Sequence, residues 1–188
     1  MSGDFMQGVE FSHALLRRHI DRGAYVIDAT AGNGYDTLFL SGLVGKKGKI
    51  WALDIQKEAI ANTQRLLKKN RAAEQVQLIN GDHQHLLDYV NIKVDGILFN
   101  LGYLPGGNKK IITKKETTLK ALRDGLDILK SAGIIVLVVY TGHSGGQEEL
   151  KSLLNFSEQL DAGTYNVIHY HFLNQDTPPP QVIGIIKR

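Results

Sequence analysis

The sequence predicts an α/β fold: a doubly wound, mostly parallel seven-stranded sheet with an antiparallel last strand, of the Rossmann-like kind. Short apolar runs rich in β-branched residues alternate with longer amphipathic segments along most of the 188 residues. The last two runs are joined by a non-helical, proline-rich link, which favours antiparallel pairing. No repeat or linker interrupts this pattern, so we expect residues 1–188 to form one domain.

The composition excludes several classes of site. The chain is 43% hydrophobic and 22% charged, which is typical of one globular domain, and its net charge of +3 permits a nucleic-acid partner. It has no cysteine, which excludes disulfides, thiolate zinc sites and cysteine nucleophiles. The first residues, MSGDFMQGVEF, lack the long apolar run typical of a signal peptide, and the longest apolar stretch, residues 134–140, is too short to cross a bilayer of about 30 Å. We therefore expect a cytoplasmic protein without membrane contact.

The first half of the chain contains an added helix and three strands. Residues 9–20 predict the helix, and residues 1–22 are expected to form an N-terminal helical extension. Strands are predicted at residues 25–29, 49–54 and 76–80. An apolar stripe at helical spacing predicts a helix between the second and third strands. The stripe comprises Ala59, Ile60, Thr63, Leu66 and Leu67.

The second half predicts two helices and four strands. Strands are expected at residues 96–100, 134–140, 166–173 and 182–187, and a helix at about 147–159. The other helix has an apolar stripe of Leu119, Leu122, Leu126 and Leu129. Thr113 and Glu116 match a reciprocal capping box at its start, and Gly133 follows its expected last turn.

A glycine-containing turn follows the first strand and opens the next helix. The sequence there reads DATAGNGYDT, from Asp28 to Thr37. Gly32 and Gly34 allow the backbone to turn sharply and approach a ligand closely. The N-terminus of the helix favours a carboxylate or a phosphate. Glycine turns also follow strands that bind nothing, so this turn alone does not identify a cofactor site.

Polar residues after the next three strands indicate a nucleoside site. Asp54 ends the second strand 22 positions after Gly32, the spacing of an acid that accepts hydrogen bonds from ribose hydroxyls. The third strand leads to Asp82 and His83, which we expect near an adenine amino group. The fourth ends in Asn100, and the aromatic Tyr103 follows.

The cofactor predicted from this turn is S-adenosyl-L-methionine rather than NAD. A dinucleotide would prefer a third glycine at the position of Thr37, where the pyrophosphate lies close to the helix. Asp36 would repel a pyrophosphate. The same carboxylate suits a zwitterionic amino acid, because it can accept hydrogen bonds from the ammonium group.

Six motifs carry a family resemblance across nearly the whole chain: DATAGNGYDT, ALDIQ, GDH, FNLGYLPGG, YTGHSGGQEE and FLNQ. In this order they resemble a bacterial family of rRNA methylases now associated with tRNA methylation. The resemblance implies a class I methyltransferase fold and methyl transfer to the amine of 5-aminomethyl-(2-thio)uridine at the tRNA wobble position. The RNA substrate would then be held at its anticodon region. An rRNA methyltransferase, a small-molecule methyltransferase and a non-catalytic nucleotide-binding module are the alternatives.

The resemblance implies positions for the cofactor. Asn33 and Asp36 would hold the methionine end, and Asp54 and Gln56 the ribose and adenosine. The complete expected set is Asp28, Gly32, Asn33, Gly34, Asp36, Thr37, Asp54, Ile55, Gln56, Asp82, His83 and Asn100.

Asn100, Tyr103 and His143 are the candidate catalytic residues. Other amino-methyltransferases often carry N-P-P-Y where this chain has Asn-Leu-Gly-Tyr, so Asn100 is expected to orient the amine and Tyr103 to contact the uracil. In N-P-P-Y enzymes a backbone carbonyl after the Asn also contacts the target N–H. Because this chain has Leu-Gly in place of Pro-Pro, whether it makes that contact stays open. His143 is the candidate base for an amine that must lose a proton, although an amine that arrives deprotonated needs none.

A basic segment, residues 108–115, follows the NLGYLPGG loop and is expected at the pocket mouth. The candidate RNA contacts are Lys109, Lys110, Lys114, Lys115, Arg17 and Arg18. They would bind phosphates without reading sequence, and ordinary solvated lysines are the alternative. Because no separate RNA-binding domain is present, a homodimer would enlarge the footprint.

No metal site is expected. The histidine pairs His83/His85 and His169/His171 have ligand-like spacing, but neither has a clear third ligand.

Overall fold

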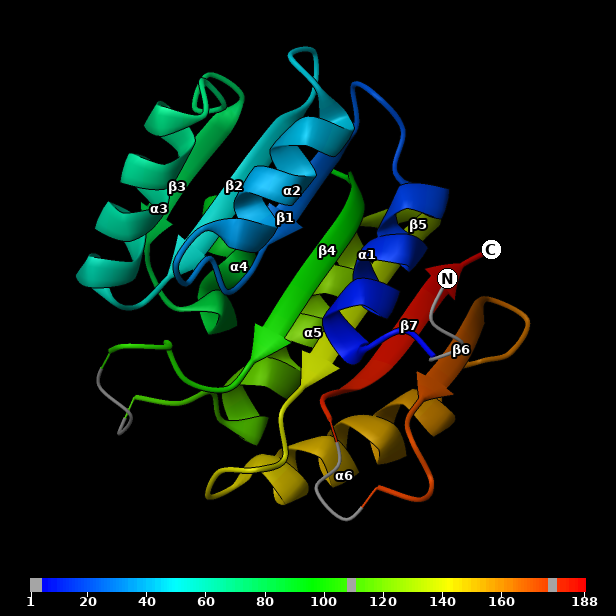
Figure 1. Cartoon of the computed structure of the whole chain (residues 1–188). Helices are drawn as coiled ribbons and strands as arrows, with labels where there is room; N and C mark the ends of the chain where they lie inside the picture. The colour runs from blue at the N-terminus through cyan, green and yellow to red at the C-terminus, as the bar shows by residue number, and fades with distance from the viewer. Residues whose placement is uncertain (1–4, 108–110, 176–178) are drawn as a thin grey trace.

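The computed structural model describes residues 5–107, 111–175 and 179–188. Its seven strands form one sheet in the order β3-β2-β1-β4-β5-β7-β6 (Figure 1). The strands are β1 (Tyr25–Asp28), β2 (Lys49–Asp54), β3 (Val76–Asn80), β4 (Val94–Leu101), β5 (Leu129–Val139), β6 (Tyr165–Tyr170) and β7 (Gln181–Lys187). The first five strands pair in parallel, and β7 runs antiparallel between β5 and β6. The predicted doubly wound sheet with an antiparallel last strand is confirmed.

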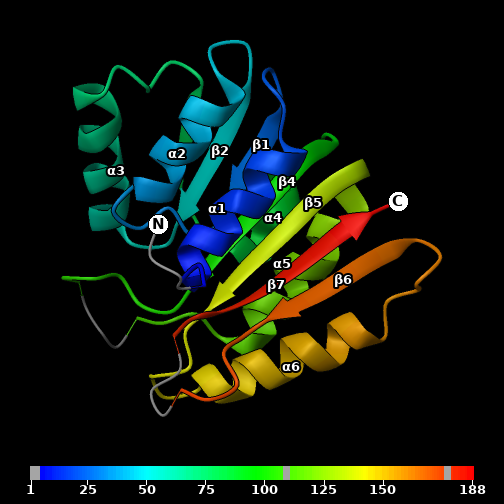
Figure 2. The same ribbon diagram turned by 45° about the vertical axis from the view of Figure 1, so that its right-hand side comes forward.

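Helices cover both faces of the sheet (Figure 2). They are α1 (Gly8–His19), α2 (Tyr35–Val44), α3 (Lys57–Lys69), the 3-10 turn η1 (His83–His85), α4 (Leu86–Tyr89), α5 (Lys115–Ile128) and α6 (Gly146–Glu158). The central strands β1, β2, β4, β5 and β7 are buried on both sides because each face packs against helices, which explains their continuous apolar runs. None of the described helices is long and apolar enough to cross a membrane.

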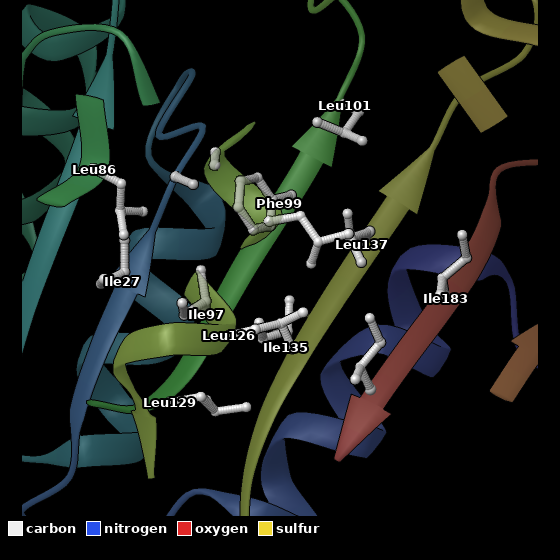
Figure 3. Close-up of a cluster of buried hydrophobic side chains, with 14 of the residues drawn as sticks. Ile27, Leu86, Ile97, Phe99, Leu101, Leu126, Leu129, Ile135, Leu137 and Ile183 are labelled. Atoms are coloured by element: carbon white, nitrogen blue, oxygen red, sulfur yellow. The ribbon is translucent and has the colours of Figure 1, made fainter. Parts of the chain in front are cut away.

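Two apolar cores result from this layering. One joins alternate residues of the strands, such as Ile97 and Phe99, to α5 residues such as Leu126 (Figure 3). The other joins the opposite face, including Leu98, to α1 and α2. Residues 97 and 98 point to different cores because successive side chains of a strand alternate between its faces.

Helix α1 crosses β5 and β7 from the carboxyl edge of the parallel strands to their amino edge. At its start, a Cβ on Gly8 would lie 2.3 Å from the Pro180 carbonyl oxygen. Beyond its end, the Ile20 side chain packs against Gly96 near the beginning of β4. The predicted N-terminal helix is therefore part of the layer that covers the sheet.

The predicted boundaries of α5 are wrong at both ends. The residue before its first turn is Lys114, and no side chain caps it. Thr113 donates instead to Glu149 Oε2 at 2.8 Å, so a tertiary partner replaces the expected capping box. The helix ends at Ile128, and Gly133 lies within β5. This part of β5 lies opposite an irregularity in β4, where the pairing register shifts between Val94 and Gly96.

Candidate functional site

A cavity of about 630 Å³ lies at the carboxyl edge of the parallel strands. Its walls come from the ends of β1, β2 and β4, the turn that leads into η1, the segment 100–105 and the segment 111–117. This is the place at which doubly wound sheets bind ligands. The volume is within the range of about 300–1,000 Å³ typical of small-molecule sites.

The glycine turn after β1 is held in place by α3. Gly32 and Gly34 have φ angles of +54° and +88°, which favour glycine. A Cβ on Gly34 would lie 2.8 Å from Cα of Thr63, so no larger residue fits without a shift of α3. Thr63 also donates to the Gly32 carbonyl oxygen at 3.0 Å. The turn is therefore a rigid part of the cavity wall.

Asn33 connects this turn to the segment after β4. Its Nδ2 donates to the Pro105 carbonyl oxygen at 3.1 Å, and its Oδ1 accepts from Asn62 at 2.9 Å. Leu104 of the same segment is buried, and it lies beside Gly32. These contacts hold the segment 102–105 across the cavity.

Asp54 joins the end of β2 to the glycine turn. Oδ2 accepts from the Gly32 N–H at 3.0 Å, and Oδ1 accepts from the Gln56 N–H at 2.8 Å. Burial raises the pKa of this carboxyl, although both hydrogen bonds favour its charged form. Asp54, Ile55 and Gln56 all line the cavity, so the predicted ribose and adenosine residues are neighbours there.

Asp82 and His83 form another wall. Asp82 accepts hydrogen bonds from the Gln84 backbone at 2.9 Å and side chain at 2.8 Å, which begins η1. His83 is 7% exposed, and its Nε2 has no partner among the described residues. Burial lowers the pKa of His83, so its ring is neutral near pH 7. A buried, uncommitted ring nitrogen suits a ligand that brings hydrogen-bonding groups.

Asp28 and Thr37 lie beneath the cavity rather than in its lining. Both are fully buried, and the Thr37 hydroxyl donates to Asp28 Oδ2 at 2.5 Å. The Thr30 N–H donates to the other oxygen at 3.2 Å. Burial, the largest cause, and the nearby Asp36 raise the pKa of Asp28 to about 7. Together with Gly34, these two residues support the glycine turn from below. The other expected cofactor residues line the cavity itself.

Asn100, at the end of β4, is bonded to Asp36 of α2. Its Nδ2 donates to Asp36 Oδ2 at 2.8 Å, and its backbone N–H donates to Thr30 Oγ1 at 2.7 Å. The other oxygen of Asp36 lies 2.7 Å from Nε2 of His13, a residue of α1. Asp36 and Asn100 line the cavity. Asp36 is thus bonded to two protein side chains, and its expected role at the methionine ammonium stays a prediction.

Tyr103 and His143 are neighbours, but only Tyr103 lines the cavity. Tyr103 lines the cavity and pairs with Ile112 through an isolated antiparallel bridge. The two rings meet edge-on, with centroids 6.4 Å apart. His143 Nδ1 lies 3.0 Å from the Ser144 carbonyl oxygen, and His143 does not line the cavity.

The predicted basic residues separate into two groups. Lys114 is exposed and lines the cavity, with the exposed Lys115 next to it. Lys109 and Lys110 lie outside the described residues.

Arg17 and Arg18 are in the last turn of α1, and neither lines the cavity. The Arg17 guanidinium carbon lies 4.9 Å from the centre of the Phe39 ring. Their expected contribution to RNA binding stays a prediction.

Comparisons with known proteins all point to methyltransferases. Residues 50–186 match the model of the family described as "Putative rRNA methylase", and residues 5–87 match that of protein-L-isoaspartate O-methyltransferases. A tRNA (mnm5s2U34)-methyltransferase of Arabidopsis thaliana chloroplasts is 42% identical over 183 residues, which cover 92% of this chain and 67% of that protein. This chain belongs to the rRNA methylase family.

Solved structures of relatives show the same fold and the cofactor product. A family protein from Clostridium thermocellum superposes with a TM-score of 0.96 at 38% identity, over 98% of this chain and all of that one. A proposed methyltransferase from Streptococcus mutans, crystallised with S-adenosylhomocysteine, gives 0.90 at 37% identity with the same coverage. The protein is an S-adenosylmethionine-dependent methyltransferase.

The cavity of this methyltransferase fits S-adenosylmethionine. The glycine turn admits close backbone approach, Asp54 places a carboxylate in the lining at the end of β2, and His83 offers a buried ring nitrogen. When bound, the cofactor supplies an electrophilic methyl group on a sulfonium. The chain's own task is to hold a nucleophile beside that methyl group and keep water away.

Sequence reasoning missed two side chains at this methyltransferase site. Tyr140, after β5, lines the cavity, and burial raises the pKa of its phenol, with Asp36 and Tyr103 acting in the same direction. His13 contacts Asp36 from a helix that begins before the first strand. Tyr140 ends a predicted strand next to the YTGHSGG motif, which was a usable signal. His13 has none, because nothing in its helical segment marks one histidine as special.

Proposed function

We propose that this methyltransferase acts on tRNA and methylates the primary amine of 5-aminomethyl-(2-thio)uridine at the wobble position. The Arabidopsis relative, whose name specifies this uridine, supports the choice of substrate. The structural observation that carries the proposal is the Asn100–Asp36 hydrogen bond at 2.8 Å in the cavity wall. Cytoplasmic location and homodimer formation stay predictions.

The Asn100–Asp36 bond determines which way the Asn100 amide faces. A carboxylate only accepts hydrogen bonds, so the Nδ2 group must face Asp36. The amide oxygen then remains for other donors, and no described residue donates to it. A primary amine is such a donor. The oxygen can therefore accept one amine hydrogen and direct the nitrogen lone pair towards the methyl group.

The amine must lose a proton before it can attack. In water an alkyl amine is mostly protonated at neutral pH, and removal from water favours its neutral form. The side chains of Leu104, Ile112 and Tyr140 make part of the cavity apolar. Because His143 does not line the cavity, we propose that the ammonium gives its proton to bulk water as desolvation at the cavity favours the neutral amine, rather than to the His143 imidazole.

The direct test is methyl transfer in vitro followed by mass spectrometry of nucleosides. The purified protein and S-adenosylmethionine are incubated with tRNA that carries the aminomethyl group, and with matched tRNA that lacks it. We expect a gain of one methyl group on the aminomethyl nucleoside only. Methylation of rRNA or of a small amine, with no change in the aminomethyl nucleoside, would contradict the proposed substrate.

Lys114 and Lys115 are proposed to bind RNA phosphates at the cavity mouth, together with Lys109 and Lys110. Replacing all four by alanine should weaken tRNA binding and make the slope of log K against log salt shallower, because fewer counterions are released. S-adenosylhomocysteine binding should not change. Fluorescence anisotropy at several salt concentrations measures both RNA quantities.

A matched control removes two lysines from the opposite end of the sheet. Lys46 and Lys47 are exposed in the turn before β2. A double alanine variant at these positions should bind tRNA like the wild type, and it is compared with a double variant at Lys114 and Lys115. Equal losses in the two double variants would show a general charge effect and would overturn the assignment of phosphate contacts.

A further inference from the structure

The α1 helix places one imidazole against the catalytic wall. His13 Nε2 lies 2.7 Å from Asp36 Oδ1, and the pair is mostly shielded, with side-chain exposures of 20% and 13%. Asp36 Oδ2 accepts from Asn100 at 2.8 Å. A continuous chain of hydrogen bonds thus runs from α1 through α2 to the amide at the end of β4.

The orientation of the His13 ring is fixed by stacking. It lies against Phe39 of α2, with ring centroids 3.7 Å apart and an interplanar angle of 4°. Phe39 is three residues after Asp36, so both contacts of His13 fall on the same side of α2. The Arg17 guanidinium, one turn further along α1, also lies over Phe39.

The helix that carries His13 is itself anchored. Phe11 stacks on Tyr170 of β6, with ring centroids 4.0 Å apart. Leu16 is fully buried against the sheet, and Gly8 is in close contact with Pro180. His13 is therefore held by packing along α1 and needs no ligand to reach Asp36.

We propose that His13 is a positioning residue for methyl transfer: it holds Asp36 so that Asn100 presents its amide oxygen to the substrate amine. Asp36 has two donors, and removing one would let the carboxylate rotate and release the Asn100 amide. The inference rests on the proposed function, because it assumes that Asn100 orients an amine.

The role needs a hydrogen-bond donor and no change of protonation. A neutral imidazole with its proton on Nε2 can donate to Asp36. The charged and titratable groups around the pair are Asp28 below it, Tyr140 across the cavity and Arg17 on α1. Since the donor is what matters, a side chain that donates from the same place without titrating should serve equally well.

Glutamine is that side chain, so His13→Gln and His13→Ala are the informative pair. His13→Ala should lower kcat roughly tenfold or more, the effect of losing one donor to a charged acceptor. His13→Gln should restore kcat to within about threefold, with the pH profile of the wild type. KM for tRNA should stay near wild type in both. His19→Ala, in the last turn of the same helix, is the matched control.

Three kinetic results would overturn the role of His13. Turnover by His13→Ala equal to the wild type would show that Asp36 needs no such donor. Turnover by His13→Gln as low as that of His13→Ala, or a shifted acidic limb in its pH profile, would show that His13 acts by exchanging a proton.

An RNA-free measurement separates this inference from the proposed substrate. The side-chain amide resonance of Asn100, assigned by its loss in Asn100→Ala, should shift in His13→Ala and return in His13→Gln. An unchanged resonance in His13→Ala overturns the inference even if the tRNA is methylated. If the wild type fails to methylate aminomethyl-tRNA while the resonance responds as expected, the substrate assignment is wrong and the link from His13 to Asn100 holds.

Discussion

Replacing Asn100 by alanine is expected to lower kcat for tRNA methylation about a hundredfold or more, while S-adenosylhomocysteine still binds. The Asn100 amide is the polar group at the end of β4 that faces the cavity, and its Nδ2 is committed to Asp36. Alanine removes the acceptor that orients the amine, and misorientation of a nucleophile costs rates of this order. The backbone bond from Asn100 to Thr30 does not involve the side chain, so the end of β4 should keep its place.

Single-turnover kinetics and calorimetry test this expectation together. Single turnover reports the chemical step, and calorimetry reports binding of S-adenosylhomocysteine. Asn155→Ala, at an exposed position of α6, is the matched control and should behave as the wild type. Asn100→Ala turnover within a few-fold of wild type would refute the orienting role. Loss of cofactor binding together with turnover would assign Asn100 to the cofactor alone.

The stability of the protein is expected to fall as pH rises towards 7, because of Asp28. The pKa of this buried carboxyl is raised from 3.8 to about 7 in the folded state. Between these values the folded state holds a proton that the unfolded state has lost, so the free energy of unfolding decreases with rising pH. The stabilisation is complete below about pH 4 and is lost as pH passes through about 7. The full difference is about 4 kcal/mol.

Asp28→Asn isolates this contribution, since the amide resembles the protonated carboxyl. Its oxygen can accept from one neighbour, and its NH2 group can donate to the Thr37 hydroxyl. Urea unfolding from pH 4 to pH 8.5 should show that Asp28→Asn gains stability relative to the wild type as pH rises. Asp88→Asn, at an exposed position, should follow the wild type. Parallel stability profiles of wild type and Asp28→Asn would contradict the raised pKa.

The central strands could be predicted from the sequence because they are buried on both faces. Such strands read as continuous apolar, β-branched runs, and β2 matches its predicted residues 49–54. The edge strand β3 also matches its predicted residues 76–80, although its side chains are only partly buried or exposed. The boundaries of α5 could not be predicted in the same way. Thr118 and Thr113 both donate to the buried carboxylate of Glu149, at 2.6 and 2.8 Å. Because Glu149 lies in α6, far from Thr113 in the sequence, no local pattern indicates that the Thr113 hydroxyl bonds to Glu149 instead of capping α5.

The candidate site also contains residues whose placement could be predicted from the sequence and residues whose placement could not. Asp54, Asp82 and Asn100 follow strand ends, and parallel topology brings strand ends to one edge, so their convergence could be expected. Arg17 and Arg18 were expected to help bind RNA phosphates, and this stays a prediction. Neither arginine lines the cavity, because α1 carries them towards the amino edge of the parallel strands, where Arg17 lies over the Phe39 ring. The direction in which a helix crosses a sheet depends on packing, which a single sequence does not display.

By itself, the sequence determined the fold class, the cofactor and the glycine turn, because each depends on residue types at short spacing. Only the tertiary structure decided that Asp36 lies between His13 and Asn100, since those bonds join residues 23 and 64 positions apart. It also decided that Asp28 and Thr37 support the cavity from below while their neighbours line it. Local sequence sets backbone conformation, whereas long-range packing sets which side chains meet and how dry their surroundings become.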